Sequence, residues 1–215
     1  MLAMAGHGHS HGHGACEHEH KAIEGDGIDE RWLFDTINFA GVRGLNLDPD
    51  IGPLTNCLKP YHERTDVSRC VTSDADEQMI IHIPFIGVVQ LKSIVINGGS
   101  GEDAPSRVKL FTNRDDVDFD NADDLVPVQE LELPPEQSHE LEFPLKIAKF
   151  NNVQSLTLYI SENFGAETTS LYYVAMKGVF KHMKVAAVEA VFELRPQAAD
   201  HKNPAEDGAM MRPGM

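Results

Sequence analysis

The sequence is poor in positive charge and has no long apolar run. It holds 18 lysines and arginines against 34 aspartates and glutamates, a formal net charge of −16 at pH 7. A chain this acidic has a poor electrostatic case for binding nucleic acid or an anionic membrane. No apolar stretch approaches the roughly 20 residues that cross a bilayer, and the N-terminus shows no secretory signal pattern. We therefore expect neither nucleic acid nor a membrane among the partners.

Cysteine is scarce. Cys16, Cys57 and Cys70 are the three present, and no Cys-x-x-Cys pair occurs. An odd, low count favours free thiols in a reducing compartment, so we expect a cytoplasmic protein, with the nucleus as a second location. A disulfide between Cys57 and Cys70 is the alternative. A thioredoxin-type redox centre is excluded because its paired cysteines are missing.

Motifs of catalysis and of cofactor binding are also missing. The sequence has no Gly-x-Ser-x-Gly elbow, no Gly-x-x-x-x-Gly-Lys-Ser/Thr loop and no strand–Gly-x-Gly-x-x-Gly–helix turn. Asp116, Asp118 and Asp120 are spaced like calcium ligands, but Asn121 stands where an EF-hand needs glycine and Pro127 where it needs glutamate. We interpret this segment as an acidic, solvated loop. We predict no catalytic residues, no cofactor and no enzymatic activity.

The two ends of the chain differ in composition from its middle. Residues 1–20 are rich in glycine and histidine, and residues 195–215 are rich in proline, alanine, aspartate and glycine. Such segments do not contain enough apolar surface to offset the entropy of ordering. We predict one domain at 21–194 between two flexible tails.

The N-terminal tail contains the most conspicuous metal-binding pattern, the alternating histidines His7, His9, His11 and His13. Neutral imidazoles of this kind can bind Zn²⁺, Ni²⁺ or Cu²⁺. A structural site needs ligands held in a fixed geometry, which glycine-separated histidines do not provide. We interpret metal binding here as adventitious. A metal-handling protein that uses this tail is the first alternative function.

The middle of the chain shows the alternation typical of β-strands. Apolar and polar residues alternate along 155–161, 79–85 and 188–194, and 88–97 is apolar on both faces near its end. Further candidate strands are 107–112, 126–133 (with a slip of phase that suggests a bulge), 140–143 and 170–180. Residues 32–39 fit either a short helix or a strand. Many short strands with glycine and proline between them predict an all-β fold, a jelly-roll β-sandwich.

Two turns carry side chains that the turns themselves do not require. Asn163-Phe164-Gly165 is expected at the tip of a hairpin between strands 155–161 and 170–180, where Asn and Gly tolerate positive φ. Phe164 either caps the core or projects as an apolar anchor for a partner. Arg64 stands between Glu63 and Asp66, which indicates either a local salt-bridge network or a polar interaction rim.

A set of motifs, in matching order along nearly the whole chain, resembles the PITH domain family. These motifs are Glu63-Arg64-Thr65-Asp66, Ser73-Asp74-Ala75-Asp76-Glu77, Ile83-Pro84-Phe85, Arg107-Val108-Lys109-Leu110-Phe111, Asp118-Phe119-Asp120, Phe150-Asn151-Asn152-Val153, Asn163-Phe164-Gly165-Ala166 and Thr168-Thr169. The resemblance implies a galactose-binding-like jelly roll. It also implies association with the 26S proteasome, since the family name denotes a proteasome-interacting module. Thioredoxin activity is not implied, because this chain lacks the thioredoxin part.

We therefore predict a monomeric, non-catalytic protein-binding module, an adaptor for the 26S proteasome or for ubiquitin-system machinery. The predicted contact residues lie in loops and are Arg64, Asp66, Asp74, Asp76, Asn163, Phe164 and Glu167. A jelly-roll hydrolase or lectin is the second alternative function.

Overall fold

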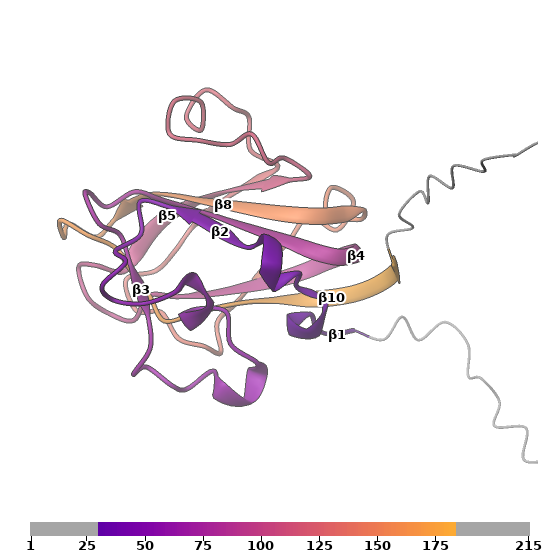
Figure 1. The fold of residues 1–215 in the computed structure, drawn as a ribbon, viewed down its shortest axis with the longest axis horizontal. Helices are drawn as coiled ribbons and strands as arrows, with labels where there is room; N and C mark the ends of the chain where they lie inside the picture. The colour runs from indigo at the N-terminus through magenta and orange to yellow at the C-terminus, as the bar shows by residue number, and fades with distance from the viewer. Residues whose placement is uncertain (1–29, 184–215) are drawn as a thin grey trace, which may run out of the picture. The chain divides into compact units, whose positions relative to one another are not determined.

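The protein folds into an antiparallel β-sandwich, which the computed structural model describes over residues 30–183. Ten strands and four short 3₁₀ turns follow one another along the chain (Figure 1). The strands are β1 (Arg31–Trp32), β2 (Arg43–Leu45), β3 (Val71–Thr72), β4 (Met79–Asn97), β5 (Pro105–Thr112), β6 (Gln129–Glu132), β7 (Glu142–Pro144), β8 (Val153–Asn163), β9 (Ser170–Leu171) and β10 (Tyr173–Met183). The 3₁₀ turns are η1 (Phe34–Thr36), η2 (Phe39–Gly41), η3 (Leu54–Asn56) and η4 (Tyr61–Glu63).

Strand β4 takes part in both layers of the sandwich. Its first part, 79–84, pairs with β2 and β8, and β8 continues the layer through β5 to β6. Its second part, 87–97, pairs with β10 and β7, and β1 extends that layer at the edge of β10. The ladder to β8 shifts register between Pro84 and Val89, at the point where the strand changes layer.

Both ends of β4 lie at the same end of the molecule. Met79 pairs with Ile160 in β8, and Asn163, three residues further along β8, pairs with Pro105. Gly98, which follows the other end of β4, lies against Pro105 so closely that an added Cβ would be 2.2 Å from its Cδ. A straight strand of this length would separate its ends by about 60 Å at 3.3 Å per residue. The strand therefore folds back at 84–88.

The core lies between the layers, as the alternation along the strands predicts. Met79, Ile81, Ile83 and Phe85 of β4 belong to one large buried cluster together with Leu156 and other residues of β8 and β10. A smaller cluster forms on the outer face of the first layer, where Val117 from the aspartate-rich loop packs on Ile80, Phe111 and Tyr159. A third forms on the outer face of the second layer, where Trp32 packs against Val95, Tyr173 and Ala175.

Several sequence-based expectations need correction. The predicted hairpin between 155–161 and 170–180 is wrong, because β8 pairs with β4 and β5 whereas β10 pairs with β4 and β1. The connection at 163–169 therefore crosses between the layers. The phase slip in 126–133 is not a bulge, because β6 begins at Gln129 and pairs with β5 without a register shift. Val126, before the strand, is 89% exposed.

The remaining expectations concern residues 32–39, the two ends of the chain and membrane-spanning segments. Residues 32–39 form the end of β1 followed by the turn η1. The strand expected at 188–194, both tails and the histidines His7, His9, His11 and His13 lie outside the described residues. Among residues 30–183, no helix has the length and apolar character needed to cross a membrane.

We predict that Gly178→Ala destabilises the domain because β10 and β4 approach each other too closely here for a side chain. A Cβ at this position would lie 2.0 Å from the carbonyl oxygen of Gln90, at a register shift between the two strands. The free energy of unfolding measured with urea should fall by about 1–3 kcal/mol, the usual cost of overpacking. Gly101→Ala is the matched control, because its Cβ would meet only the movable carboxylate of Asp103. Equal stability of the two variants would contradict the close approach.

Candidate functional site

Five loops meet at the end of the sandwich where β4 begins and ends. We call segments 46–50, 73–78, 98–104, 134–139 and 163–169 together the loop end. Backbone hydrogen bonds connect them in a chain: the amide of Asp74 donates to Asn46, Ser73 to Thr169, Phe164 to Glu102, and Gln137 to Gly99, with N···O distances of 3.3, 2.9, 3.0 and 2.9 Å. Loops tied to one another in this way form a surface of fixed shape.

Asn46 organises the first two of these loops. Its backbone is in the left-handed region at φ 57°, which asparagine tolerates better than most residues. Its side-chain amide donates to the carboxylate of Asp76 at 2.7 Å and to the carbonyl of Gln78 at 2.6 Å, and its Oδ1 accepts from the amide of Ala75 at 2.9 Å. The predicted contact residues Asp74 and Asp76 are thus held in place by a residue that the sequence analysis did not single out.

Asn163 shapes the loop that carries Phe164. Its side chain donates to the carbonyls of Ala166 and Thr168, both at 3.0 Å, and accepts from the amide of Gly165 at 2.8 Å. Gly165 has a φ of 123°, as the turn chemistry predicts. Phe164 is 37% exposed, and Glu167 on the same loop is also exposed. The Asn163 side chain is fully occupied within its own loop, whereas Phe164 presents part of its ring to solvent.

Gln137 connects the 98–104 and 134–139 loops from a buried position. Its side chain accepts from the amide of Gly98 at 2.9 Å and donates to the carbonyl of Pro105 at 2.6 Å. Gly98 is required here, because an added Cβ would also lie 2.7 Å from the carbonyl oxygen of Ser170. An open cleft borders this junction, and Asp103, His139 and the ring of Tyr172 are among its walls.

The loop end is strongly acidic and carries no lysine or arginine. Its nine carboxylates are Asp48, Asp50, Asp74, Asp76, Glu77, Glu102, Asp103, Glu136 and Glu167. All of them are exposed or half-buried. Within residues 30–183, none of these nine carboxylates lies within 4.0 Å of a basic nitrogen, whereas acids elsewhere, such as Glu142 and Glu162, pair with lysine or arginine.

Arg64 and Asp66 belong to a different segment, which has its own network. Hydrogen bonds from Ser68 and Arg69 hold the pKa of Asp66 well below its usual range. The buried Lys59 donates its ammonium protons to the carbonyls of Asp66 and Arg69, and burial lowers its pKa. Arg69 also pairs with Glu63. The ion pairs around Asp66 are therefore made by Arg69, and the guanidinium of Arg64 is left for another contact.

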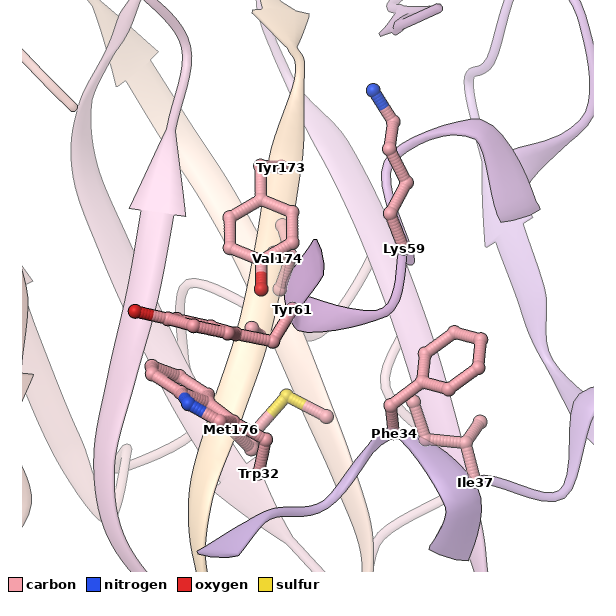
Figure 2. Close-up of a pocket in the computed structure, with 9 residues that line it drawn as sticks. Trp32, Phe34, Ile37, Lys59, Tyr61, Tyr173, Val174 and Met176 are labelled. Carbon is pink, nitrogen blue, oxygen red and sulfur yellow. The ribbon is translucent and has the colours of Figure 1, made fainter. Parts of the chain in front are cut away.

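That contact is an aromatic stack on the outer face of the second layer. The guanidinium carbon of Arg64 lies 4.0 Å from the centroid of the Tyr61 ring, and Tyr61 stacks on Trp32 with centroids 4.9 Å apart and planes at 17°. Lys177, held by Glu30 and Glu142, lies 5.7 Å from the Trp32 ring. Figure 2 shows the Trp32 and Tyr61 rings of this stack, which line a small pocket together with Tyr173 and Met176 of β10.

No sequence pattern predicted this pocket. Its residues come from the β1–η1 region, the segment before β3, and β10, which are far apart in the chain, so no local motif marks them. The one available signal is that Trp32 is the single tryptophan of the sequence.

The other predicted chemistries find no assembled site in the described part of the chain. Within residues 30–183, no group of three histidine, cysteine or acidic side chains could hold a metal ion. In the aspartate-rich loop, Asp116 pairs with Arg114 and Asp123 with Lys109. Cys57 and Cys70 are free thiols, and burial raises the pKa of Cys57 to about 12. A thiol with such a pKa is a poor nucleophile at neutral pH.

Comparisons with known proteins place these features in context. A family model described as the PITH domain matches residues 25–196. The chain is 39% identical to PITH domain-containing protein CG6153 of Drosophila melanogaster over 197 residues, 90% of this chain and 92% of that protein. It is 38% identical to PITH domain-containing protein 1 of Homo sapiens over 146 residues, 67% of this chain and 69% of that protein.

Solved structures show the same fold with little sequence similarity. The CBM32 domains of Clostridium perfringens ZmpB, solved with GalNAc, match with a TM-score of 0.53 at 8% identity, covering 71% of this chain and 37% of that chain. The family 32 carbohydrate-binding module of C. perfringens NanJ, solved with galactose, matches with a TM-score of 0.51 at 8% identity. The match covers 69% of this chain and 98% of that chain. These matches establish a galactose-binding-like jelly roll, and the bound sugars belong to those proteins.

We predict that replacing Asn46 loosens the loop end. Both Asn46→Gly and Asn46→Ala remove the side-chain hydrogen bonds, which should lower the free energy of unfolding by about 1–3 kcal/mol. Alanine should cost about 1 kcal/mol more than glycine, because it must adopt positive φ. Urea denaturation measures both, and faster hydrogen exchange at the amide of Ala75 should accompany the loss. Unchanged exchange at that amide would count against the organising role of Asn46.

The stability should depend on pH through Asp66. Its pKa is lowered in the folded state, so its contribution is complete above the unfolded value of about 3.9 and declines as the pH falls below it. Asp66→Asn should therefore be less stable than the wild type at pH 7, and this gap in stability between the two proteins should narrow toward pH 3. Thermal unfolding across this range measures the gap. A gap that stays constant with pH would show that the ionised carboxylate is not the stabilising species.

Proposed function

Because the chain belongs to the PITH domain family, we propose that it is a non-catalytic protein-binding module that docks on a basic surface of a protein partner through the loop end. The partner that the family resemblance suggests is the 26S proteasome or associated ubiquitin-system machinery. The free thiols of Cys57 and Cys70 fit a cytoplasmic or nuclear protein. We expect it to act as a monomer.

The observation that carries this proposal is the set of nine carboxylates that have no basic partner within residues 30–183. Like charges held together on one rigid surface repel each other, and a partner that supplies lysines and arginines relieves this repulsion. Such complementarity raises the association rate and excludes acidic partners. The hydrogen bonds between the loops reduce the entropy lost on binding, since the surface is already ordered.

Phe164 supplies the apolar part of the contact. It projects from a loop that the Asn163 side chain ties together by hydrogen bonds, and it borders an open groove with Arg107 and Glu162. Interfaces commonly obtain most of their affinity from a few such side chains within a polar rim. Asp74, Asp76 and Glu167 would form this rim, and Asn163 would act by holding the Phe164 loop in shape. Arg64 and Asp66 lie on the separate segment that carries the aromatic stack.

We predict that Phe164→Asp abolishes most of the partner binding. Recovery of proteasome subunits from cell lysate on immobilised full-length protein should fall by at least about tenfold, as expected for an anchor worth about 2 kcal/mol. Phe119→Asp is the matched control, because Phe119 is 38% exposed but lies on the aspartate-rich loop outside the loop end. It should leave recovery unchanged, with both variants checked for folding by circular dichroism.

The charge contribution is tested in the same assay. The triple variant Asp74→Lys, Glu102→Lys and Glu167→Lys should lose recovery, and wild-type recovery should decrease as salt rises from 50 to 300 mM. Two results would refute the proposal: no proteasome recovery by the wild type, or recovery that neither Phe164→Asp nor the charge reversal reduces.

A further inference from the structure

The aromatic pocket contains a buried hydroxyl without a hydrogen-bond partner. Tyr173 is 1% exposed, and among residues 30–183 its hydroxyl makes no hydrogen bond. Burial raises the pKa of this hydroxyl to about 12, against the opposing effect of the nearby Arg64 charge, so it keeps its proton at neutral pH. A buried donor left unsatisfied costs about 1–3 kcal/mol, so such a group requires an explanation.

A second unsatisfied donor, the Nε of Arg64, lies on the face of the Tyr61 ring toward which the Tyr173 hydroxyl points. Trp32 covers one face of that ring, so the guanidinium of Arg64, 4.0 Å from the centroid, must cover the other. In Figure 2 the Tyr173 hydroxyl points toward Tyr61 from the face opposite Trp32. The Nε of Arg64 is buried and, within residues 30–183, has no acceptor. The two donors therefore lie on the same side of the Tyr61 ring, and the charge of Arg64 is near enough to act on the Tyr173 hydroxyl.

The surroundings favour a negatively charged acceptor on an apolar body. The pocket lining contains Phe34, Ile37, Val174 and Met176 and no acidic residue, although the protein as a whole is strongly acidic. Lys59 also lines the pocket, but its ammonium is directed away from Tyr61 in Figure 2 and donates to the carbonyls of Asp66 and Arg69. In a setting of low polarity, a hydrogen bond from the neutral Tyr173 hydroxyl to a carboxylate is roughly twice as strong as one to a neutral acceptor.

The size of the cavity limits what can be buried. The volume in which the centre of a water molecule can lie is about 10 Å³, which is enough for about one water molecule. Tyr61 is the single exposed residue among those that line it and is 43% exposed. A ligand can therefore insert one atom of a terminal group, such as a single carboxylate oxygen, while the rest of it lies on the surface over the Tyr61–Trp32 stack. An extended polypeptide C-terminus with an apolar last residue meets this requirement, because it carries a carboxylate beside an apolar side chain.

We propose that this pocket binds the C-terminal carboxylate of a partner polypeptide whose last residue is apolar, with Tyr173 and Arg64 as its hydrogen-bond donors. This site is separate from the loop end and goes beyond the function proposed above. It adds a second contact surface, which recognises a chain terminus where the loop end recognises a basic surface.

The chain's single tryptophan makes the test direct, because Trp32 lines the pocket and reports its occupation by fluorescence. Full-length protein is titrated with acetyl-Gly-Ser-Ala-Leu as the free acid, with the same peptide as its C-terminal amide, and with sodium acetate. We expect saturable binding of the acid and at least about tenfold weaker binding of the amide, since a hydrogen bond to a charged group contributes about 1.5–3 kcal/mol. Acetate should bind at least tenfold more weakly than the acid, because it lacks the apolar side chain.

Two matched pairs of variants assign the donors. Tyr173→Phe and Arg64→Gln should each weaken binding of the acid by about tenfold. Tyr172→Phe and Arg31→Gln make the same chemical changes at residues that neither line the pocket nor lie over the Tyr61 ring, and these variants should bind like the wild type. Phe164→Asp should bind the peptide like the wild type, so that failure here and failure of loop-end docking are distinguishable.

Four results would overturn the proposal: no binding of the acid, equal binding of acid and amide, acetate binding as tight as peptide binding, or full affinity in Tyr173→Phe. The last would mean that the hydroxyl serves an enclosed water molecule instead of a ligand.

Discussion

Strand β4 belongs to both layers, and this constraint determines where the loops lie. Since 79–84 pair with β8 and 87–97 pair with β10, the strand must fold back, and its two ends meet at one end of the sandwich. The neighbouring loops are then close enough for hydrogen bonds such as Phe164 to Glu102. Without the bend at Pro84–Gly87, the acidic segments would be distributed along the molecule and would not form one surface.

The protein separates its charges over two surfaces. Carboxylates without basic partners gather at the loop end, whereas Arg64 lies over the Tyr61 ring and the ammonium of Lys59 is bonded to backbone carbonyls. This separation has a physical reason. A guanidinium over an aromatic ring is stabilised by the electrons of the ring, and Lys59 donates to backbone carbonyls, so neither needs a carboxylate. The acids of the loop end are thereby left without a basic partner among residues 30–183.

Particular residues show how far prediction from sequence reached. Alternation identified the strand cores, since Met79, Ile81 and Ile83 do face the interior, and the turn chemistry identified the loop of Gly165. The hairpin expected around that loop was wrong, because antiparallel neighbours in sequence need not pair when a third strand, here β4, lies between them. The pocket of Trp32, Tyr61 and Tyr173 was not predictable, because three distant segments build it.

The sequence by itself determined the all-β class, the acidic character and the positions of the turns, since these follow from local alternation, composition and backbone preferences. Only the tertiary structure decided which carboxylates share a surface without a basic partner, and that the donors of Arg64 and Tyr173 lie on one side of the Tyr61 ring. Those properties depend on pairings between residues far apart in the chain, such as Asn97 with Tyr173. Long-range pairing is set by the packing of the whole core, which no local stretch of sequence encodes.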